Sequence, residues 1–77
     1  MVSAIDKYAI DKIRELRQAK GISQSQLAFE LEMSTGFIAM IESGKFEKKY
    51  NISHLNKIAF ILQCSPKDFM PEVPFDK

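Results

Sequence analysis

The chain has 77 residues, of which 45% are hydrophobic and 27% charged, and its formal net charge is +1. This composition is typical of one small globular domain near the size at which a hydrophobic core alone stabilises a fold, and it excludes a disordered chain. The near-neutral charge excludes a general electrostatic attraction to nucleic acid, so any basic surface has to be local. A single cysteine excludes an internal disulfide bond.

No stretch of the sequence has the roughly 18 consecutive apolar residues of a membrane span. Asp6 interrupts the apolar part of the first ten residues, which argues against a signal peptide. We therefore expect a cytoplasmic protein with no membrane partner. We also expect a single domain over residues 1–77, with its core at about 5–70 and a proline-containing tail at 71–77.

A first helix is expected before Gly21, because apolar residues recur there at helical spacing and glycine suits the left-handed backbone that often ends a helix. A second is expected at about residues 24–31. Ser23 stands in its N-cap position, followed three residues later by Gln26 as in a capping box. The apolar positions of the first helix are Ile5, Ala9, Ile13 and Leu16.

A third helix is expected after a short turn at residues 32–33. Ser34 can cap its beginning and Gly44 can end it. Two capped helices joined by so short a turn form a helix-turn-helix.

A fourth helix is expected to follow the lysine-rich loop, with Ser53 as its N-cap. Ser65 and Pro66 then place an N-cap and a first-turn proline at the start of a short fifth helix, which the prolines of the tail cannot continue. No segment shows the sustained alternation of a strand, so the sequence predicts an all-α fold, a compact bundle of five short helices. The apolar stripe of the fourth helix is Leu55, Ile58, Ala59 and Leu62.

Residues 13–69 resemble the phage-repressor (Cro/XRE) type of helix-turn-helix, whose fold is lambda-repressor-like. The resemblance implies a sequence-specific transcriptional regulator that binds double-stranded DNA as a homodimer, with its third helix in the major groove. It also implies an ion pair between Arg17 and Glu42; alternatively, Arg17 is a solvated helix residue. The markers, in the order of the family, are Gly21, Ser23, Gln24, Leu27, Ala28, Ile38, Ile41, Glu42, Gly44, Lys45, Leu55, Ile58, Ala59 and Leu62.

Phosphate contacts are expected where the second helix begins and just past the third. The free N–H groups at a helix N-terminus attract a phosphate, and Gln24 matches the family's phosphate-binding glutamine. The lysines after the third helix lie where such proteins touch the DNA backbone, although a solvated loop is the simpler alternative and Glu47 dilutes the charge. The full expected set is Ser23, Gln24, Phe37, Ser43, Lys45, Lys48, Lys49 and Tyr50.

Base contacts are expected from the outward flank of the third helix, at Thr35, Gly36, Ala39 and Met40. This flank departs from the family because it has no Arg, Lys, Asn or Gln to make a bidentate contact with a base. Thymine methyl groups, one hydroxyl and a close approach at the glycine remain, which predicts modest selectivity with a preference for T-rich steps or for DNA shape.

A second departure is Glu32, where the family usually has glycine. If the turn keeps the family's geometry, this glutamate adopts a left-handed conformation at a cost of about 1–2 kcal/mol. The alternative is a slightly different turn.

We expect no enzyme, cofactor, metal site or small-molecule ligand. His54 has no second histidine or cysteine at ligand spacing and is expected to face solvent in the first turn of the fourth helix. Cys64 is expected to pack near Phe69 at the start of the fifth helix. The serines are explained as helix caps, and the sequence offers no set of nucleophile, base and acid that suggests a catalytic site.

Phe60 points away from the apolar stripe of its helix and needs another explanation. It packs under the tail, contributes to a dimer contact with Ile61, Val73 and Phe75, or is simply exposed. The alternative function is a helix-turn-helix fold used as a protein-protein interaction module, or an antitoxin-like adaptor with weak DNA selectivity. Among DNA-binding roles, the sequence does not distinguish a Cro-like repressor, a restriction-modification controller and an antitoxin.

Overall fold

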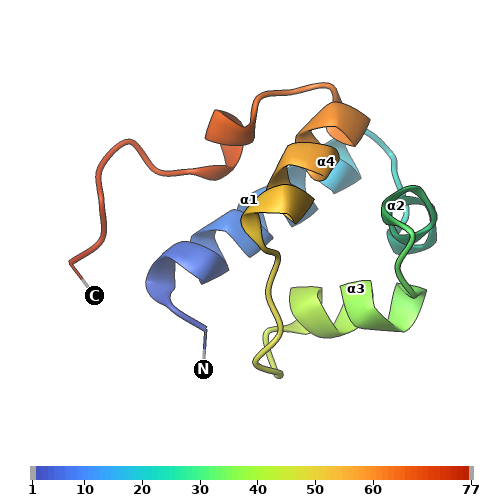
Figure 1. The fold of residues 1–77 in the computed structure, drawn as a ribbon, viewed down its shortest axis with the longest axis horizontal. Helices are drawn as coiled ribbons and strands as arrows, with labels where there is room; N and C mark the ends of the chain where they lie inside the picture. Colours follow the sequence, from blue (N-terminus) through green and yellow to red (C-terminus); the bar gives the residue numbers. More distant parts are fainter. Residues whose placement is uncertain (1, 77) are drawn as a thin grey trace.

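The computed structural model describes residues 2–76, which form four α-helices and one 3-10 helix (Figure 1). The all-α prediction is confirmed, but the fifth helix is a single 3-10 turn and not an α-helix. Met70 is extended at φ −114° because it precedes Pro71, and a residue before proline avoids the helical region. The elements are α1 (Ala4–Ala19), α2 (Gln24–Leu31), α3 (Thr35–Ser43), α4 (Ile52–Leu62) and η1 (Pro66–Phe69).

The helices surround one hydrophobic core to which every helix contributes. In Figure 1, α1 and α4 lie together in the centre of the molecule, α2 is seen almost end-on beside them, and α3 runs along the lower edge. Because α3 lies at an edge, one side of it faces the core and the other is free. The side chains that are completely or almost completely buried are Ile13, Leu27, Ile38, Ile41, Ile58, Leu62 and Phe69.

Serine caps begin α2, α3 and η1, as the sequence predicts. Ser23 accepts a hydrogen bond from the backbone N–H of Gln26 at 3.0 Å, and Ser34 accepts one from Phe37 at 3.1 Å. Each bond satisfies an N–H group that has no partner within its helix. Ser65 caps η1 in the same way, and there Asp68 completes the capping box by accepting from the Ser65 N–H at 3.0 Å.

The expected cap of α4 is wrong, because this helix begins earlier than Ser53. Asn51 is the N-cap, and its Oδ1 accepts a hydrogen bond from the His54 N–H at 2.8 Å. The Nδ1 atom of His54 accepts one in return from the Asn51 N–H at 3.1 Å. Asparagine caps a helix as well as serine does, so the helix can begin at Ile52, before the expected serine. The histidine is half-buried and has a structural role in this reciprocal cap.

The turn between α2 and α3 keeps the left-handed conformation expected from the family. Glu32 has φ 57° and ψ 41°, and its N–H lies near the carbonyl groups that end α2. Gly21 and Gly44 end α1 and α3 with φ 70° and 71°. Gln63 ends α4 with φ 57° in the same way, although a residue other than glycine is strained in this conformation.

The tail does not cover Phe60. Figure 1 shows the chain after η1 running back toward the side of the molecule where α1 begins. There the Phe75 ring lies 6.0 Å from the ring of Tyr8. Phe60 is 87% exposed, so the prediction that it packs under the tail is wrong. None of the described helices is both long enough and apolar enough to cross a membrane.

Candidate nucleic-acid interface

The two sides of α3 have separate roles. Ile38 and Ile41 are buried between the helices, whereas Thr35 and Gly36 at the start of the helix are exposed. Ala39 and Met40 are half-buried on the outer side, and Phe37, also half-buried, packs against the core. The helix therefore uses its isoleucines for the core and leaves one flank open to a partner.

Gly36 is not explained by packing within the protein. A Cβ atom placed there would meet no atom within 4 Å, and the residue lies in a right-handed helix where its flexibility is not needed. Glycine in a helix costs about 0.5–1 kcal/mol relative to alanine. Its value here lies in the open surface that it leaves at the start of α3, beside Thr35.

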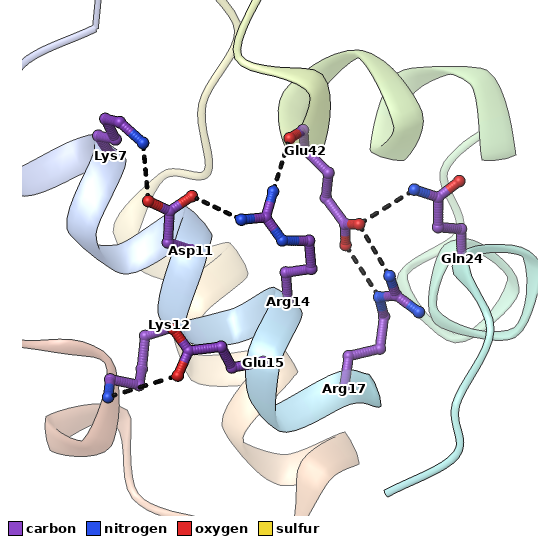
Figure 2. Close-up of polar contacts among 8 residues, drawn as sticks. All are labelled: Lys7, Asp11, Lys12, Arg14, Glu15, Arg17, Gln24 and Glu42. Atoms are coloured by element: carbon purple, nitrogen blue, oxygen red, sulfur yellow. Dashed lines mark hydrogen bonds and ion pairs between the residues drawn. The ribbon is translucent and has the colours of Figure 1, made fainter. Parts of the chain in front are cut away.

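A buried ion pair ties the C-terminal end of α3 to α1, as the resemblance implies. The Nε and Nη2 atoms of Arg17 donate to the two carboxylate oxygens of Glu42 at 2.9 and 2.8 Å (Figure 2). The two side chains are only 8% and 4% exposed. The third nitrogen of the same guanidinium group, Nη1, donates to the Ile22 carbonyl oxygen at 2.7 Å. This arrangement fixes the spacing between α1, the start of α2 and the end of α3.

Gln24 is part of the same network. Its Nε2 atom donates at 3.0 Å to Oε1 of Glu42, the same carboxylate oxygen that accepts from Nη2 of Arg17 (Figure 2). The side chain is half-buried at the first residue of α2. An amide nitrogen carries two hydrogens, so a second donor remains for a partner outside the protein.

Tyr50 does not fit a phosphate contact, and that expectation is wrong. Its ring is 6% exposed, and within residues 2–76 its buried hydroxyl has no hydrogen-bond partner. Burial raises the pKa of this hydroxyl, and the negative charge of Glu42 raises it further. Burying the apolar ring outweighs the polar character of the surrounding loop. The tyrosine therefore belongs to the core and does not face a DNA strand.

The loop after α3 carries three exposed lysines. Lys49 lies 3.4 Å from the carboxylate of Asp6, while Lys45 and Lys48 are exposed close to the end of α3. Partial burial acts to raise the pKa of Asp6, but hydrogen bonds from Ser3 and Lys49 and the lysine charge outweigh it and lower that pKa. The loop thus presents positive charge next to α3, with Lys49 partly neutralised.

The two serines of the expected phosphate set take part in the helix ends. The Ser23 hydroxyl is the cap of α2. The Ser43 hydroxyl donates to the Met40 carbonyl at 2.9 Å and accepts from the Lys45 N–H at 3.2 Å. Both serines remain exposed, so these local hydrogen bonds do not remove them from the protein surface.

Comparison with known families places these features in context. A model of the Cro/C1-type helix-turn-helix DNA-binding domain matches residues 12–74. The chain belongs to this family. No curated protein sequence matches the chain.

The solved structures that resemble this Cro/C1-type domain include the restriction-modification controller protein C.AhdI from Aeromonas hydrophila. The two share 29% sequence identity with a TM-score of 0.70, and the match covers 86% of this chain and 96% of the controller. Hydroxypropylphosphonic acid epoxidase from S. wedmorenis matches with 21% identity and a TM-score of 0.73 over 97% of this chain. That match covers only 39% of the epoxidase chain and shows the fold alone.

Three residues of this Cro/C1-type domain were missed in the sequence. Arg14 donates to the backbone carbonyl of Glu42 at 3.0 Å and so places a cation at the C-terminal end of α3. Ser25 accepts from the Thr35 hydroxyl at 3.4 Å, which links the starts of α2 and α3. Phe29 is 80% exposed on α2. Only Arg14 had a sequence signal, because it lies one turn before Arg17.

Proposed function

We propose that this Cro/C1-type domain is a transcriptional regulator that binds double-stranded DNA sequence-specifically as a homodimer, with α3 in the major groove. The observation that supports the proposal most directly is the division of α3. Its isoleucines hold it against the core while Thr35 and Gly36 stay exposed beside the beginning of α2. A helix held at the edge of a small domain in this way can enter a groove without unfolding.

Backbone contacts would come from both sides of this flank. At the start of α2, Ser23 and Gln24 lie beside free N–H groups, where the helix dipole favours a phosphate. The second amide hydrogen of Gln24 is available for that contact, since the first is donated to Glu42. Beyond the other end of α3, Lys45, Lys48 and Lys49 reach the next phosphates.

Base contacts in this proposal are mainly apolar. Met40, Ala39 and the methyl group of Thr35 meet thymine methyl groups, and the open surface at Gly36 lets a base edge approach the helix backbone. Such contacts discriminate less than bidentate ones, so DNA shape supplies part of the selectivity.

The kind of regulator is proposed from the similarity to C.AhdI. That protein is a restriction-modification controller, and its similarity to this chain extends over nearly its whole length. We propose that this chain acts as a regulator of the same kind, in which two copies occupy two half-sites. A single small module buries a modest DNA surface, so two half-sites about one helical turn apart provide the affinity.

The test is selection of bound duplexes from a random library, followed by fluorescence anisotropy over a range of salt concentrations. The logarithm of the affinity is expected to fall with the logarithm of salt by about 0.9 for each phosphate contact. Lys48→Gln should lower that slope by about 0.9 and weaken binding to all sequences alike. Gln24→Ala should also weaken binding to all sequences alike but leave the slope unchanged, because the amide carries no charge. Met40→Ala should instead change the order of preference among sequences. Lys67→Gln is the matched control, because this exposed lysine lies on η1 and away from α3.

A second candidate function is a protein-interaction module, favoured by the apolar character of the outer flank of α3. The same measurements separate the two candidates. Negligible binding to every duplex at low salt would reject the DNA-binding proposal and favour a protein partner for this flank.

A further inference from the structure

A groove lies on the surface where α4 passes α2 and the beginning of η1. It has a volume of about 490 Å³, within the range of about 300–1,000 Å³ typical of binding pockets. Its apolar lining comes from both α4 and the segment after it. The residues that line it are Glu30, Asn56, Lys57, Ala59, Phe60, Ile61, Cys64 and Pro66.

Phe60 forms one wall of this groove and is itself almost unprotected. It is 87% exposed although the groove beside it is lined by the half-buried side chains of Ile61 and Cys64. A projecting phenyl ring next to an apolar hollow is the arrangement that allows one surface to fit a second copy of itself. In a two-fold contact the same patch faces its own image, so each ring can enter the other copy's groove.

The lining of the groove also carries one charged side chain of each sign, on different helices. Glu30 on α2 and Lys57 on α4 are both exposed, and within the described residues neither takes part in an ion pair. A two-fold contact can set the α2 part of the patch in one copy against the α4 part in the other. Glu30 of each copy then meets Lys57 of the other, giving two equivalent ion pairs.

We propose that this groove is the homodimer surface, with Phe60 of each copy inserted into the groove of the other and a Glu30–Lys57 ion pair at each side. The inference rests on the proposed function for the need to occupy two half-sites. A second copy is favoured over an unrelated partner because the same patch carries both the projecting ring and the hollow, and both signs of charge. Val73 and Phe75 lie outside this surface, since the tail packs toward Tyr8.

The test is the monomer–dimer equilibrium of the 77-residue chain, measured by sedimentation equilibrium. Phe60→Ser should raise the dissociation constant about 30-fold or more, because a central aromatic anchor typically carries this share of the binding energy. Glu30→Lys and Lys57→Glu should each raise it about 10-fold, since each places like charges face to face. The double charge exchange Glu30→Lys/Lys57→Glu should bring it back to within about 3-fold of the unmodified chain.

Phe29→Ser is the matched control. Phe29 is 80% exposed on α2 next to Glu30 but does not line the groove, so its replacement should leave the equilibrium unchanged. Circular dichroism checks that every variant is folded, as expected for exposed positions. A monomeric unmodified chain at about 0.1 mM, an unchanged equilibrium in Phe60→Ser, or no recovery in the double exchange would each overturn the proposal.

Failure of this inference and failure of the proposed function give different results. A chain that dimerises through Phe60 but binds no duplex keeps the dimer surface and rejects the DNA-binding role. A chain that binds selected duplexes while Phe60→Ser dimerises normally keeps the DNA-binding role and rejects this surface. A monomeric Phe60→Ser variant should retain weak binding to a single half-site with about half the salt dependence.

Discussion

The two ends of α3 are held in different ways. At the C-terminal end, Glu42 is surrounded by donors from Arg17, Gln24 and Arg14 and is almost fully buried (Figure 2). At the N-terminal end, the helix has the Ser34 cap and one long contact between the Thr35 and Ser25 hydroxyl groups. The polar network at the C-terminal end fixes the position of the helix, so the N-terminal end can present an open surface with few hydrogen bonds.

The largest effect is expected from breaking the network at its charged centre. Arg17→Met leaves the carboxylate of Glu42 buried without its main partner, which should lower the free energy of unfolding by about 3–5 kcal/mol. For a domain of this size that is a drop in Tm of more than about 10 °C. Thermal and urea unfolding followed by circular dichroism measure both quantities.

The double variant Arg17→Met/Glu42→Met is the control for this prediction. With both charges removed, no uncompensated charge stays in the core, so a large part of the lost stability should return. If the single variant is as stable as the unmodified chain, the network does not hold α3 in place.

A substitution at the N-terminal end of α3 should instead raise the stability of the domain. Gly36→Ala adds a methyl group that meets no atom of the protein, and alanine favours the helix, so stability should rise by about 0.5–1 kcal/mol. Affinity for selected duplexes should fall about 10-fold, because the methyl group occupies the space in which a base edge approaches. Unfolding and anisotropy measurements on one preparation give both values.

Ala39→Gly provides a matched comparison on the same flank of α3. It should lower stability by about as much as Gly36→Ala raises it, without narrowing the surface. Parallel losses of stability and DNA affinity in Gly36→Ala would mean that the glycine serves the fold and not the interface.

Much of the fold could be predicted because its causes are local. Gly21, Ser23 and Ser34 mark helix ends through their own backbone preferences and hydroxyl groups, and the spacing of apolar residues defines the core side of α4. The fifth helix was predicted in place but not in type, since the difference between one 3-10 turn and an α-helix depends on Met70 and the proline after it.

The remaining features depend on contacts between distant segments. Tyr50 looked polar in its loop, but the core had room for its ring, and the path of the tail away from Phe60 follows from the Phe75–Tyr8 contact. Arg14 reaches α3 only because α1 and α3 pack together. The Arg17–Glu42 pair was anticipated because the resemblance supplied the tertiary information that spacing alone does not contain.

The smallest effect is expected at the turn that precedes the N-terminal end of α3. Glu32 holds φ 57° at a cost of about 1–2 kcal/mol, and Glu32→Gly removes that cost while adding flexibility to the unfolded chain worth about 0.4–1 kcal/mol. The net result should be a stability gain of roughly 0.5–1 kcal/mol in urea unfolding.

Two control variants test whether the gain comes from the left-handed backbone. Gln63→Gly, at the same φ at the end of α4, should give a similar gain, whereas Glu30→Gly inside α2 should give a loss of about 1 kcal/mol. Because the turn positions the start of α3 without help from a polar network, a loss of stability in Glu32→Gly would show that contacts of the glutamate side chain, and not the backbone turn, hold this end.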